Sequence, residues 1–271
     1  MEIYFYIILF IIGALFGSFY TLAVYRIPKR QDITHKHSYC PNCNHKLGFL
    51  DLIPIFSYIF LRGKCRYCKQ KIRPRYLILE ILSGLLFVLL GYAMKLDILN
   101  LTITKIVEFS FMVLYFTFII LIAGIDNENR KIDKMVSVYG IVISVCYMVY
   151  LCIVEHANIY RYGIYLFFYI IVLILDTITL KKFAKNSYIT GILLMIITMA
   201  IFTGEHITIN AIILTLISIA IFILIYKIKE RKNRAKKKET EIAKDISIGF
   251  YLGVSNILTL ICVLVFSNYV I

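Results

Sequence analysis

The most regular feature of the chain is a series of long apolar segments separated by short charged ones. A helix that crosses the roughly 30 Å hydrocarbon core of a bilayer needs about 20 apolar residues. On that basis the pattern predicts an all-α polytopic membrane protein with about eight transmembrane helices. The expected ranges are 3–25, 76–94, 106–125, 135–154, 161–180, 188–203, 207–226 and 247–268.

Composition supports the membrane interpretation. Of the 271 residues, 61% are hydrophobic and only 17% are charged, and a soluble domain of this size needs more charge to cover its surface. The formal net charge of +14 would suggest a nucleic-acid partner in a soluble protein. In a membrane protein, basic cytosolic loops explain the same excess. We therefore expect a lipid bilayer as partner and no nucleic acid.

The positions of Lys and Arg predict the orientation. If the loops alternate between the two sides, one side holds 27 of the 30 Lys and Arg residues, in loops 26–75, 126–134, 181–187 and 227–245. The other side holds the remaining three, Lys95, Lys105 and Arg161. Because cytosolic loops carry the excess of basic residues, we expect the four basic loops to be cytosolic and both termini to lie outside.

We expect three regions along the chain, and the first loop is the second of them. Residues 1–25 form a first transmembrane helix, and residues 26–75 form a small cytosolic loop domain. Residues 76–271 form a helical membrane domain that includes the basic cytosolic linker 227–245. Such a linker attracts anionic lipid, but we expect it to act mainly as a solvated loop that fixes topology.

Two C-x-x-C pairs lie in the first loop, Cys40 with Cys43 and Cys65 with Cys68. Cytosolic thiols stay reduced, so such pairs indicate metal ligands before disulfides. Zn²⁺ takes four soft ligands in a tetrahedron, and each C-x-x-C turn offers two of them. Metal would also stabilise a loop that is too small for an apolar core. The sequence predicts a structural zinc site here; a redox dithiol pair and four plain structural thiols remain alternatives.

The residues around the two pairs resemble a known family. The relevant runs are Gly17-Ser18-Phe19, Tyr25-Arg26-Ile27-Pro28, Asp51-Leu52-Ile53-Pro54, Ser57-Tyr58, Leu61-Arg62-Gly63-Lys64-Cys65-Arg66, and Arg75-Tyr76 with Glu80. Together with the cysteines they resemble the N-terminal half of type IV prepilin peptidases. Segment 246–253 is similar to the final-helix motif of the same family, with Ser247 and Phe250 where that motif usually carries prolines.

The resemblance implies a multi-pass aspartic endopeptidase of the bacterial inner (plasma) membrane. Such enzymes remove the short basic leader of type IV prepilins and pseudopilins at the cytosolic face. Many of them then methylate the new N-terminus with S-adenosylmethionine, an activity associated with the cysteine-bearing region. The expected partners are therefore a prepilin or pseudopilin precursor and, for methylation, S-adenosylmethionine.

Aspartic proteolysis needs two carboxylates that share one proton around a water molecule. The family places the first at the cytosolic end of a helix that ends in an apolar-Asp pattern. Residues 121–126 match this pattern, so the resemblance nominates Asp126. Without the resemblance, an acidic residue at the end of a membrane helix is usually an ordinary boundary residue. Asp133, seven residues further on, would share the site if the loop folds back.

The second carboxylate is harder to assign, because the G-x-G-D-x-K turn of the family is missing. Asn186, 60 residues after Asp126, stands where the family carries its aspartate, and an amide cannot exchange a proton. Asp176 is the replacement candidate, because carboxylates inside apolar spans are usually functional or paired. The alternative is that Asp176 pairs with Lys181 or Lys182 at the interface.

Two functions follow from these observations. The first is a prepilin-peptidase-like endopeptidase that uses Asp126 and Asp176. The second is a catalytically degenerate paralogue that keeps the four-cysteine fold and acts as a prepilin-binding or assembly factor, or as a methyltransferase only.

Overall fold

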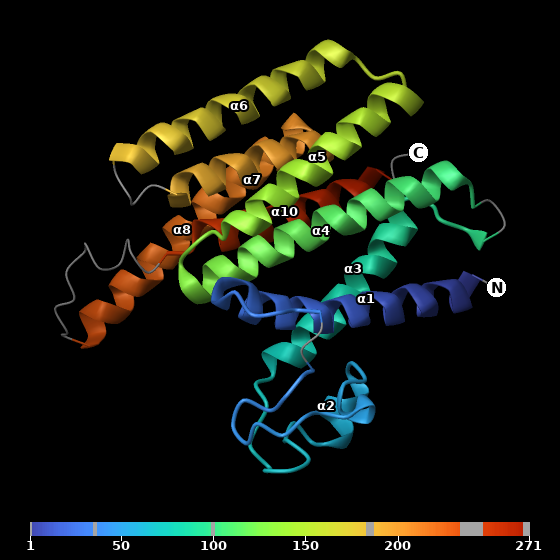
Figure 1. The fold of residues 1–271 in the computed structure, drawn as a ribbon, viewed down its shortest axis with the longest axis vertical. Coiled ribbons are helices and arrows are strands. Elements are labelled where there is room, and N and C mark those ends of the chain that lie inside the picture. Colours follow the sequence, from blue (N-terminus) through green and yellow to red (C-terminus); the bar gives the residue numbers. More distant parts are fainter. Residues whose placement is uncertain (1, 35–36, 99–100, 183–186, 234–245, 268–271) are drawn as a thin grey trace. The chain divides into compact units, whose positions relative to one another are not determined.

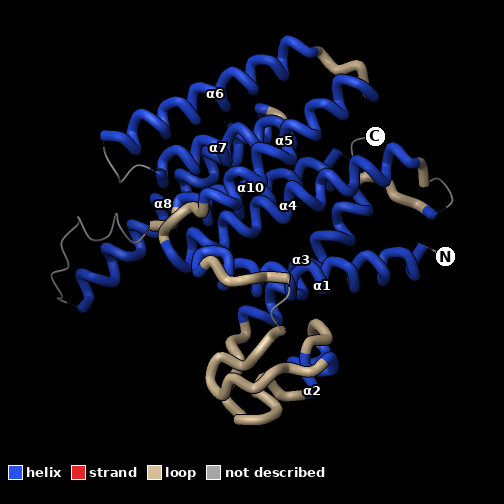
Figure 2. Tube along the Cα trace, viewed as in Figure 1, coloured by secondary structure: helices blue, strands red, loops and turns tan. Residues whose placement is uncertain are grey.

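The computed structural model describes residues 2–34, 37–98, 101–182, 187–233 and 246–267. Within these ranges the chain is helical and contains no β-strand; two isolated bridges, Tyr39 with Lys46 and Lys64 with Lys71, are its only β-type pairings. Figure 2 shows the helices joined mostly by short connections, with one long irregular segment in the N-terminal part. That segment is the cysteine loop.

Among the described residues, eight apolar helices correspond to the eight expected spans. They are α1 (Glu2–Arg26), α3 (Arg75–Ala93), α4 (Ile103–Asn129), α5 (Lys134–Val154), α6 (Ile159–Lys182), α7 (Ser187–Thr203), α8 (Glu205–Asn233) and α10 (Ile248–Ser267). Within the described ranges, seven of them are long and apolar enough to cross a membrane, and α7 is a shorter apolar helix. The prediction of an all-α, multi-pass membrane protein is confirmed.

The chain divides into two compact units, Met1–Ser110 and Phe111–Ile271. The first contains α1, the cysteine loop, α3 and the beginning of α4. The second contains the remainder of α4 and all later helices, of which α5, α6 and α7 run side by side (Figure 1). Helix α10 packs against α8 and α7 in the same unit.

Small residues allow α1 and α3 to pack closely. A Cβ atom added to Gly13 would lie 2.6 Å from the backbone oxygen of Ser83, and one added to Gly17 would lie 2.8 Å from the Cα of Glu80. The two glycines are four residues apart, which is the small-xxx-small spacing found at close helix crossings in membranes. Because the contacted atoms belong to the backbone, the helices must move apart to accept a side chain at either position.

This packing gives a first testable prediction. We expect Gly17→Ala to destabilise the first unit by about 1–3 kcal/mol, because the new methyl group overpacks the crossing. The matched control is Gly163→Ala on α6, where an added Cβ meets nothing within 4 Å. Unfolding in mixed micelles, followed by circular dichroism, measures both. Equal stability of the two variants would contradict the packing argument.

Buried polar side chains connect the helices of the second unit. The Tyr115 hydroxyl on α4 donates to Oδ1 of Asn256 on α10 at 2.5 Å. The Tyr169 hydroxyl on α6 lies 3.1 Å from Oγ of Ser144 on α5 and 2.8 Å from Oγ1 of Thr198 on α7. In a bilayer such groups must be satisfied inside the protein, so these bonds help to fix which helices are neighbours.

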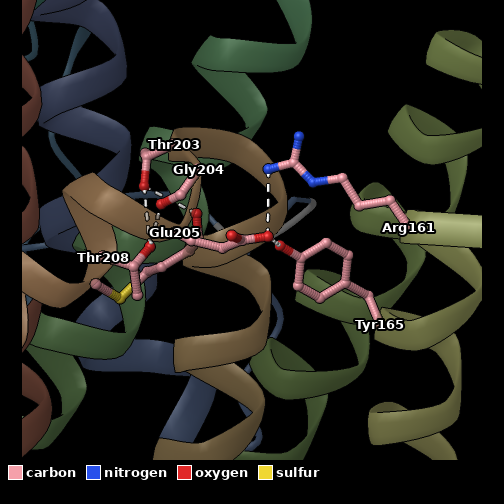
Figure 3. A network of polar contacts seen from close by, with 7 residues as sticks. Arg161, Tyr165, Thr203, Gly204, Glu205 and Thr208 are labelled. Carbon is pink, nitrogen blue, oxygen red and sulfur yellow. Dashed lines mark hydrogen bonds and ion pairs between the residues drawn. The ribbon is translucent and has the colours of Figure 1, made fainter. Parts of the chain in front are cut away.

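A second polar cluster lies where α7 turns into α8 (Figure 3). Gly204 makes the turn with a φ of +82°, and Glu205 begins α8. Oε1 of Glu205 accepts a hydrogen bond from the Tyr165 hydroxyl at 2.7 Å and lies 3.4 Å from a guanidinium nitrogen of Arg161. Arg161 and Tyr165 are one turn apart on α6, so the cluster ties α6 to the α7–α8 turn.

Candidate functional site

The two C-x-x-C pairs occupy two turns of the same construction. In each turn the backbone N–H of the first cysteine donates to the backbone carbonyl oxygen five residues ahead, Cys40 to His45 and Cys65 to Gln70. The carbonyl of the same cysteine accepts from the residue four positions later, Asn44 or Lys69. The residue that closes each turn has a positive φ, 56° at Asn44 and 59° at Lys69. Each turn therefore directs two thiols to one side.

The two turns bring all four thiols together. The Sγ atoms of Cys40, Cys43, Cys65 and Cys68 all lie within 4.8 Å of one another, and those of Cys40 and Cys68 are 3.8 Å apart. A tetrahedral Zn²⁺ with Zn–S bonds of about 2.3 Å requires sulfur–sulfur distances of about 3.8 Å. The predicted cluster is present, and its geometry suits a single tetrahedral ion. The four thiols could together hold one metal ion.

The surroundings of Cys68 and Cys43 shift the pKa values of these two thiols in opposite directions. A backbone hydrogen bond at Gln70, followed by the Asn42 side chain, lowers the pKa of the Cys68 thiol to about 6. At Cys43 the backbone hydrogen bond at His45 acts in the same direction, but desolvation and the neighbouring thiols outweigh it and raise the pKa to about 11. Thiolates are the metal-binding form of cysteine, so the hydrogen bonds to Cys68 favour its metal-binding form, whereas desolvation and the neighbouring thiols oppose that form at Cys43.

Polar contacts outside the cluster hold the two turns together. Oδ1 of Asp51 accepts from Nε of Arg66 at 2.6 Å, and Oδ2 accepts from the Tyr67 hydroxyl at 3.3 Å. Burial raises the pKa of Asp51, but Arg66 and the Gly48 backbone N–H outweigh it, so the net shift is downward. The ring of Tyr67 in turn lies 3.6 Å, centroid to centroid, from that of His45 in the other turn. His45 thus packs against the loop instead of joining the cluster.

Two buried charged residues attach the loop to its flanking helices. Arg26, only 2% exposed, ends α1 and donates to the carbonyl oxygens of Asp32 and His37 at 2.9 and 3.1 Å. Glu80 on α3 accepts from the backbone N–H of Ile55 at 2.7 Å. Ile55 has a φ of +65°, which is unfavourable for a β-branched residue. The loop is therefore held at both ends by side chains that belong to the membrane helices.

The carboxylate of Asp126 lies in a second, separate cluster within the later helices. Asp126 is fully buried, and its Oδ2 accepts from the Tyr188 hydroxyl at 3.0 Å and from the Phe250 backbone N–H at 3.2 Å. Gly249 leaves room for it, since an added Cβ would lie 3.0 Å from Oδ2. The Tyr188 hydroxyl also accepts from the Ile248 backbone N–H at 3.0 Å. Asp126 therefore sits at the N-terminus of α10, where free backbone N–H groups favour negative charge.

The two oxygens of the Asp126 carboxylate differ in their hydrogen bonding. Oδ1 of Asp126 is buried and has no hydrogen-bond partner among the described residues. A buried, unsatisfied carboxylate oxygen costs free energy unless a further donor reaches it. Chemically, one oxygen is fixed by two donors, while the other remains able to accept a proton or a hydrogen bond from a water molecule or a peptide group.

The second candidate acid, Asp176, also contacts α7. Its Oδ1 accepts from the Thr190 hydroxyl at 2.8 Å, two residues after Tyr188. Successive helical residues are about 100° apart, so Tyr188 and Thr190 extend to roughly opposite sides of α7. Asp126 and Asp176 thus contact different sides of the same first turn. Asn186 lies outside the described residues, as do the side chains of Lys181 and Lys182, so the alternative pairing of Asp176 with them stays a prediction.

Asp133 has a local structural role. Its side chain accepts the backbone N–H of Met135 at 2.9 Å and caps the start of α5. Capping by aspartate or asparagine is worth about 1 kcal/mol to a helix. Sequence reasoning missed the two partners of Asp126, Tyr188 and the start of α10. The similarity of segment 246–253 to a family motif was a usable signal for α10, whereas a tyrosine at the end of an apolar segment carries none.

Comparison with known proteins concerns mainly the first unit. Residues 11–94 match the family model of the Bacterial Peptidase A24 N-terminal domain. The Prepilin leader peptidase/N-methyltransferase of Klebsiella pneumoniae is 38% identical over 92 residues, covering 32% of this chain and 40% of that protein. The proteins of the same name from Myxococcus xanthus and Bacillus subtilis are 41% identical over 83 residues and 42% over 84, covering 31% of this chain each and 25% and 34% of the relatives. No solved structure matches the chain.

The fold and the cysteine cluster define the class of this protein. It is a multi-pass, all-α membrane protein with a four-cysteine loop between its first two long helices. Its N-terminal region is similar to the Bacterial Peptidase A24 N-terminal domain and to the corresponding part of prepilin leader peptidases/N-methyltransferases. The match spans two fifths or less of each of these relatives. The family model ends at residue 94, before Asp126 and its surroundings.

Proposed function

We propose that the chain is a membrane aspartic endopeptidase that cleaves the leader peptides of type IV prepilins or pseudopilins. The observation that carries this proposal is the match of residues 11–94 to the Bacterial Peptidase A24 N-terminal domain. A fully buried carboxylate, Asp126, supports it at the end of α4. Cleavage takes place at the cytosolic face of the bacterial plasma membrane, in agreement with the excess of basic residues in the loops assigned to that side.

We assign to Asp126 the role of general base for a catalytic water. Oδ2 is held by Tyr188 and by the Phe250 backbone N–H, while Oδ1 has no partner among the residues described. A water at Oδ1 would transfer its proton to the carboxylate as it attacks the scissile carbonyl. The leaving amine then needs an acid, and we assign this role to Asp176, which must approach from the Thr190 side of α7.

The cysteine loop supplies the second part of the proposal. Residues 26–75 act as a cytosolic domain around a structural zinc ion bound by Cys40, Cys43, Cys65 and Cys68. The names of the matched relatives include N-methyltransferase, and we extend this activity to the present chain, with S-adenosylmethionine as the methyl donor. The helical region 76–271 would carry the peptidase chemistry.

Co-expression with a prepilin from the same genome tests the peptidase function. The wild-type chain should shorten the prepilin on a denaturing gel, and both Asp126→Asn and Asp176→Asn should abolish this. Asn186→Ala should process normally. Mass spectrometry of the processed N-terminus reports methylation independently. No shortening by the wild type would sink the endopeptidase proposal.

A second function is favoured by one specific observation. The donors that contact Asp126 are a tyrosine and the start of α10, and the nominated partner Asp176 contacts the other side of α7. This arrangement suits a catalytically degenerate paralogue that binds prepilins, assists assembly or only methylates. For such a protein, wild type should show no cleavage and Asn186→Asp should gain it, because the substitution restores a carboxylate at the family spacing.

A further inference from the structure

A strip of large apolar side chains is exposed on the cysteine loop, outside the helices long enough to span a membrane. The most exposed are Phe49 at 82% and Phe60 at 81%. We call this surface the apolar strip, and its members are Phe49, Leu50, Leu52, Phe56, Ile59 and Phe60. The short helical turn Phe49–Asp51 contacts the short helix Phe56–Phe60, so these side chains share one part of the loop, and a large exposed apolar patch marks an interaction surface in a folded protein.

The apolar strip is exposed because of the way the loop folds, since other side chains of the same segment do turn inward. Phe56, Ile59 and Phe60 lie on one face of the short helix α2 (Phe56–Phe60), because residues three and four apart share a side of a helix. Phe56 and Phe60 stack with ring centroids 6.4 Å apart. Tyr58, on the other face, turns inward, and its hydroxyl donates to the Ile72 carbonyl at 3.4 Å.

The residues before α2 are arranged in the same way, with apolar side chains outside and a polar side chain inside. Phe49 and Leu50 point outward, whereas the Asp51 side chain between them and α2 is only 5% exposed and pairs with Arg66. In this segment the polar side chains are turned in and the apolar ones are turned out. This is the reverse of what water selects, and it is what a lipid environment selects.

A hydrogen bond joins the segment that carries the strip to α3. The backbone N–H of Ile55, next to α2, donates to Glu80. Glu80 is five residues beyond Arg75, the first residue of α3, which corresponds to about 7.5 Å along the helix axis. Ile55, which immediately precedes α2, therefore lies level with a residue inside an expected span. Interfacial segments bury their apolar face about 5–10 Å into the boundary between headgroups and acyl chains.

Charge indicates which lipid the strip meets. Residues 26–75 contain twelve Lys and Arg residues against two Asp residues, and one of those, Asp51, is paired within the loop. Exposed cations follow α2 directly at Arg62 and Lys64, and others lie just before α3 at Lys71 and Arg73. Basic residues that flank an apolar interfacial segment attract anionic lipid headgroups.

We propose that the apolar strip is an interfacial membrane anchor that inserts into an anionic leaflet. Its aromatic and aliphatic side chains enter the boundary with the acyl chains, and the neighbouring cations contact lipid phosphates. The anchor holds the four-cysteine cluster against the membrane surface. It does not depend on whether the chain cleaves prepilins, since it uses none of the residues of the Asp126 cluster.

The test uses the fact that the chain contains no tryptophan, so a single introduced indole reports its own surroundings. The full-length Phe60→Trp variant is reconstituted into phosphatidylcholine vesicles with and without phosphatidylglycerol. Phosphatidylcholine brominated at shallow or deep acyl positions serves as the quencher. Gln70→Trp, exposed in the second cysteine turn, is the matched reference, and Phe49→Trp is a second reporter in case Phe60→Trp fails to fold.

We expect shallow brominated lipid to quench Trp at position 60 several-fold more strongly than deep brominated lipid, and several-fold more strongly than Trp at position 70. Phosphatidylglycerol should strengthen this quenching, and combined Arg62→Gln and Lys64→Gln should remove the increase. If Trp at both 60 and 49 is unquenched, the anchor is wrong. An unquenched but blue-shifted tryptophan emission would mean that another part of the chain covers the strip. A blue shift that occurs only when prepilin is added would mean that the strip binds the substrate. Either result overturns the proposal.

Discussion

Asp126→Asn will reduce the rate of prepilin processing about 100- to 10,000-fold, the range that a general acid or base contributes to catalysis. The amide keeps the shape of the side chain, and its oxygen still accepts from Tyr188 and from the Phe250 backbone N–H. What it loses is the ability of the second oxygen to take a proton. Initial rates of leader removal, measured with purified protein in detergent and a synthetic prepilin, give the size of the effect.

The control for this substitution is Asp133→Asn, seven residues along the chain. Asp133 caps α5 through the Met135 backbone N–H, and asparagine caps a helix about as well as aspartate. This variant should process prepilin at the wild-type rate. Circular dichroism of both variants checks that the helices remain. If Asp126→Asn kept wild-type activity, Asp126 would be a structural cap for α10 and the catalytic assignment would be lost.

A related substitution separates chemistry from positioning. Tyr188→Phe removes the hydroxyl that bridges Asp126 and the Ile248 backbone N–H, but the Phe250 backbone N–H continues to hold the carboxylate. If Tyr188 only positions Asp126, activity should fall by less than it does in Asp126→Asn. A comparison of kcat and KM for the two variants shows the difference. Both changes act on the same chemical step, but a positioning defect lowers its rate less than the loss of the base does.

The membrane helices could be predicted from the sequence because their signal is local. The length of an apolar segment and the charge that follows it determine where a span begins and ends. The cysteine cluster was equally accessible, because each C-x-x-C turn fixes two thiols within a few residues. The structure adds how the turns are locked, through Asp51 and the stacking of Tyr67 on His45.

The surroundings of Asp126 could not be predicted in the same way. Its partners, Tyr188 and Phe250, lie 62 and 124 residues away in the chain. Such contacts depend on how α4, α7 and α10 pack, and helix packing in a bilayer follows small steric and polar details, not hydropathy. The same limit applies to Asp176, where neither the spacing nor the apolar context indicated a contact with Thr190.

Removal of a zinc ion from the proposed four-cysteine site should have its largest effect on the cysteine loop. In the described part of residues 27–74, only Cys40, Gly63 and Cys65 are buried, so the loop has no apolar core apart from the thiols. Binding of zinc to a structural site contributes on the order of 10–16 kcal/mol, and little else in the loop replaces it. The wild-type chain should therefore purify with about one zinc ion per molecule, since four thiolates complete one tetrahedral site.

Cys65→Ser should lose this ion and unfold the loop, whereas Cys146→Ser, at an exposed position on α5, should keep it. Trypsin reports the difference, because the loop is rich in Lys and Arg and is cut rapidly once its turns open. Treatment of the wild type with a strong zinc chelator should produce the same cleavage pattern as Cys65→Ser, while the membrane helices stay intact. Less than about half an equivalent of bound zinc in the wild type, or a loop equally resistant in both variants, would mean that hydrogen bonds such as Asp51 with Arg66 suffice to hold the fold.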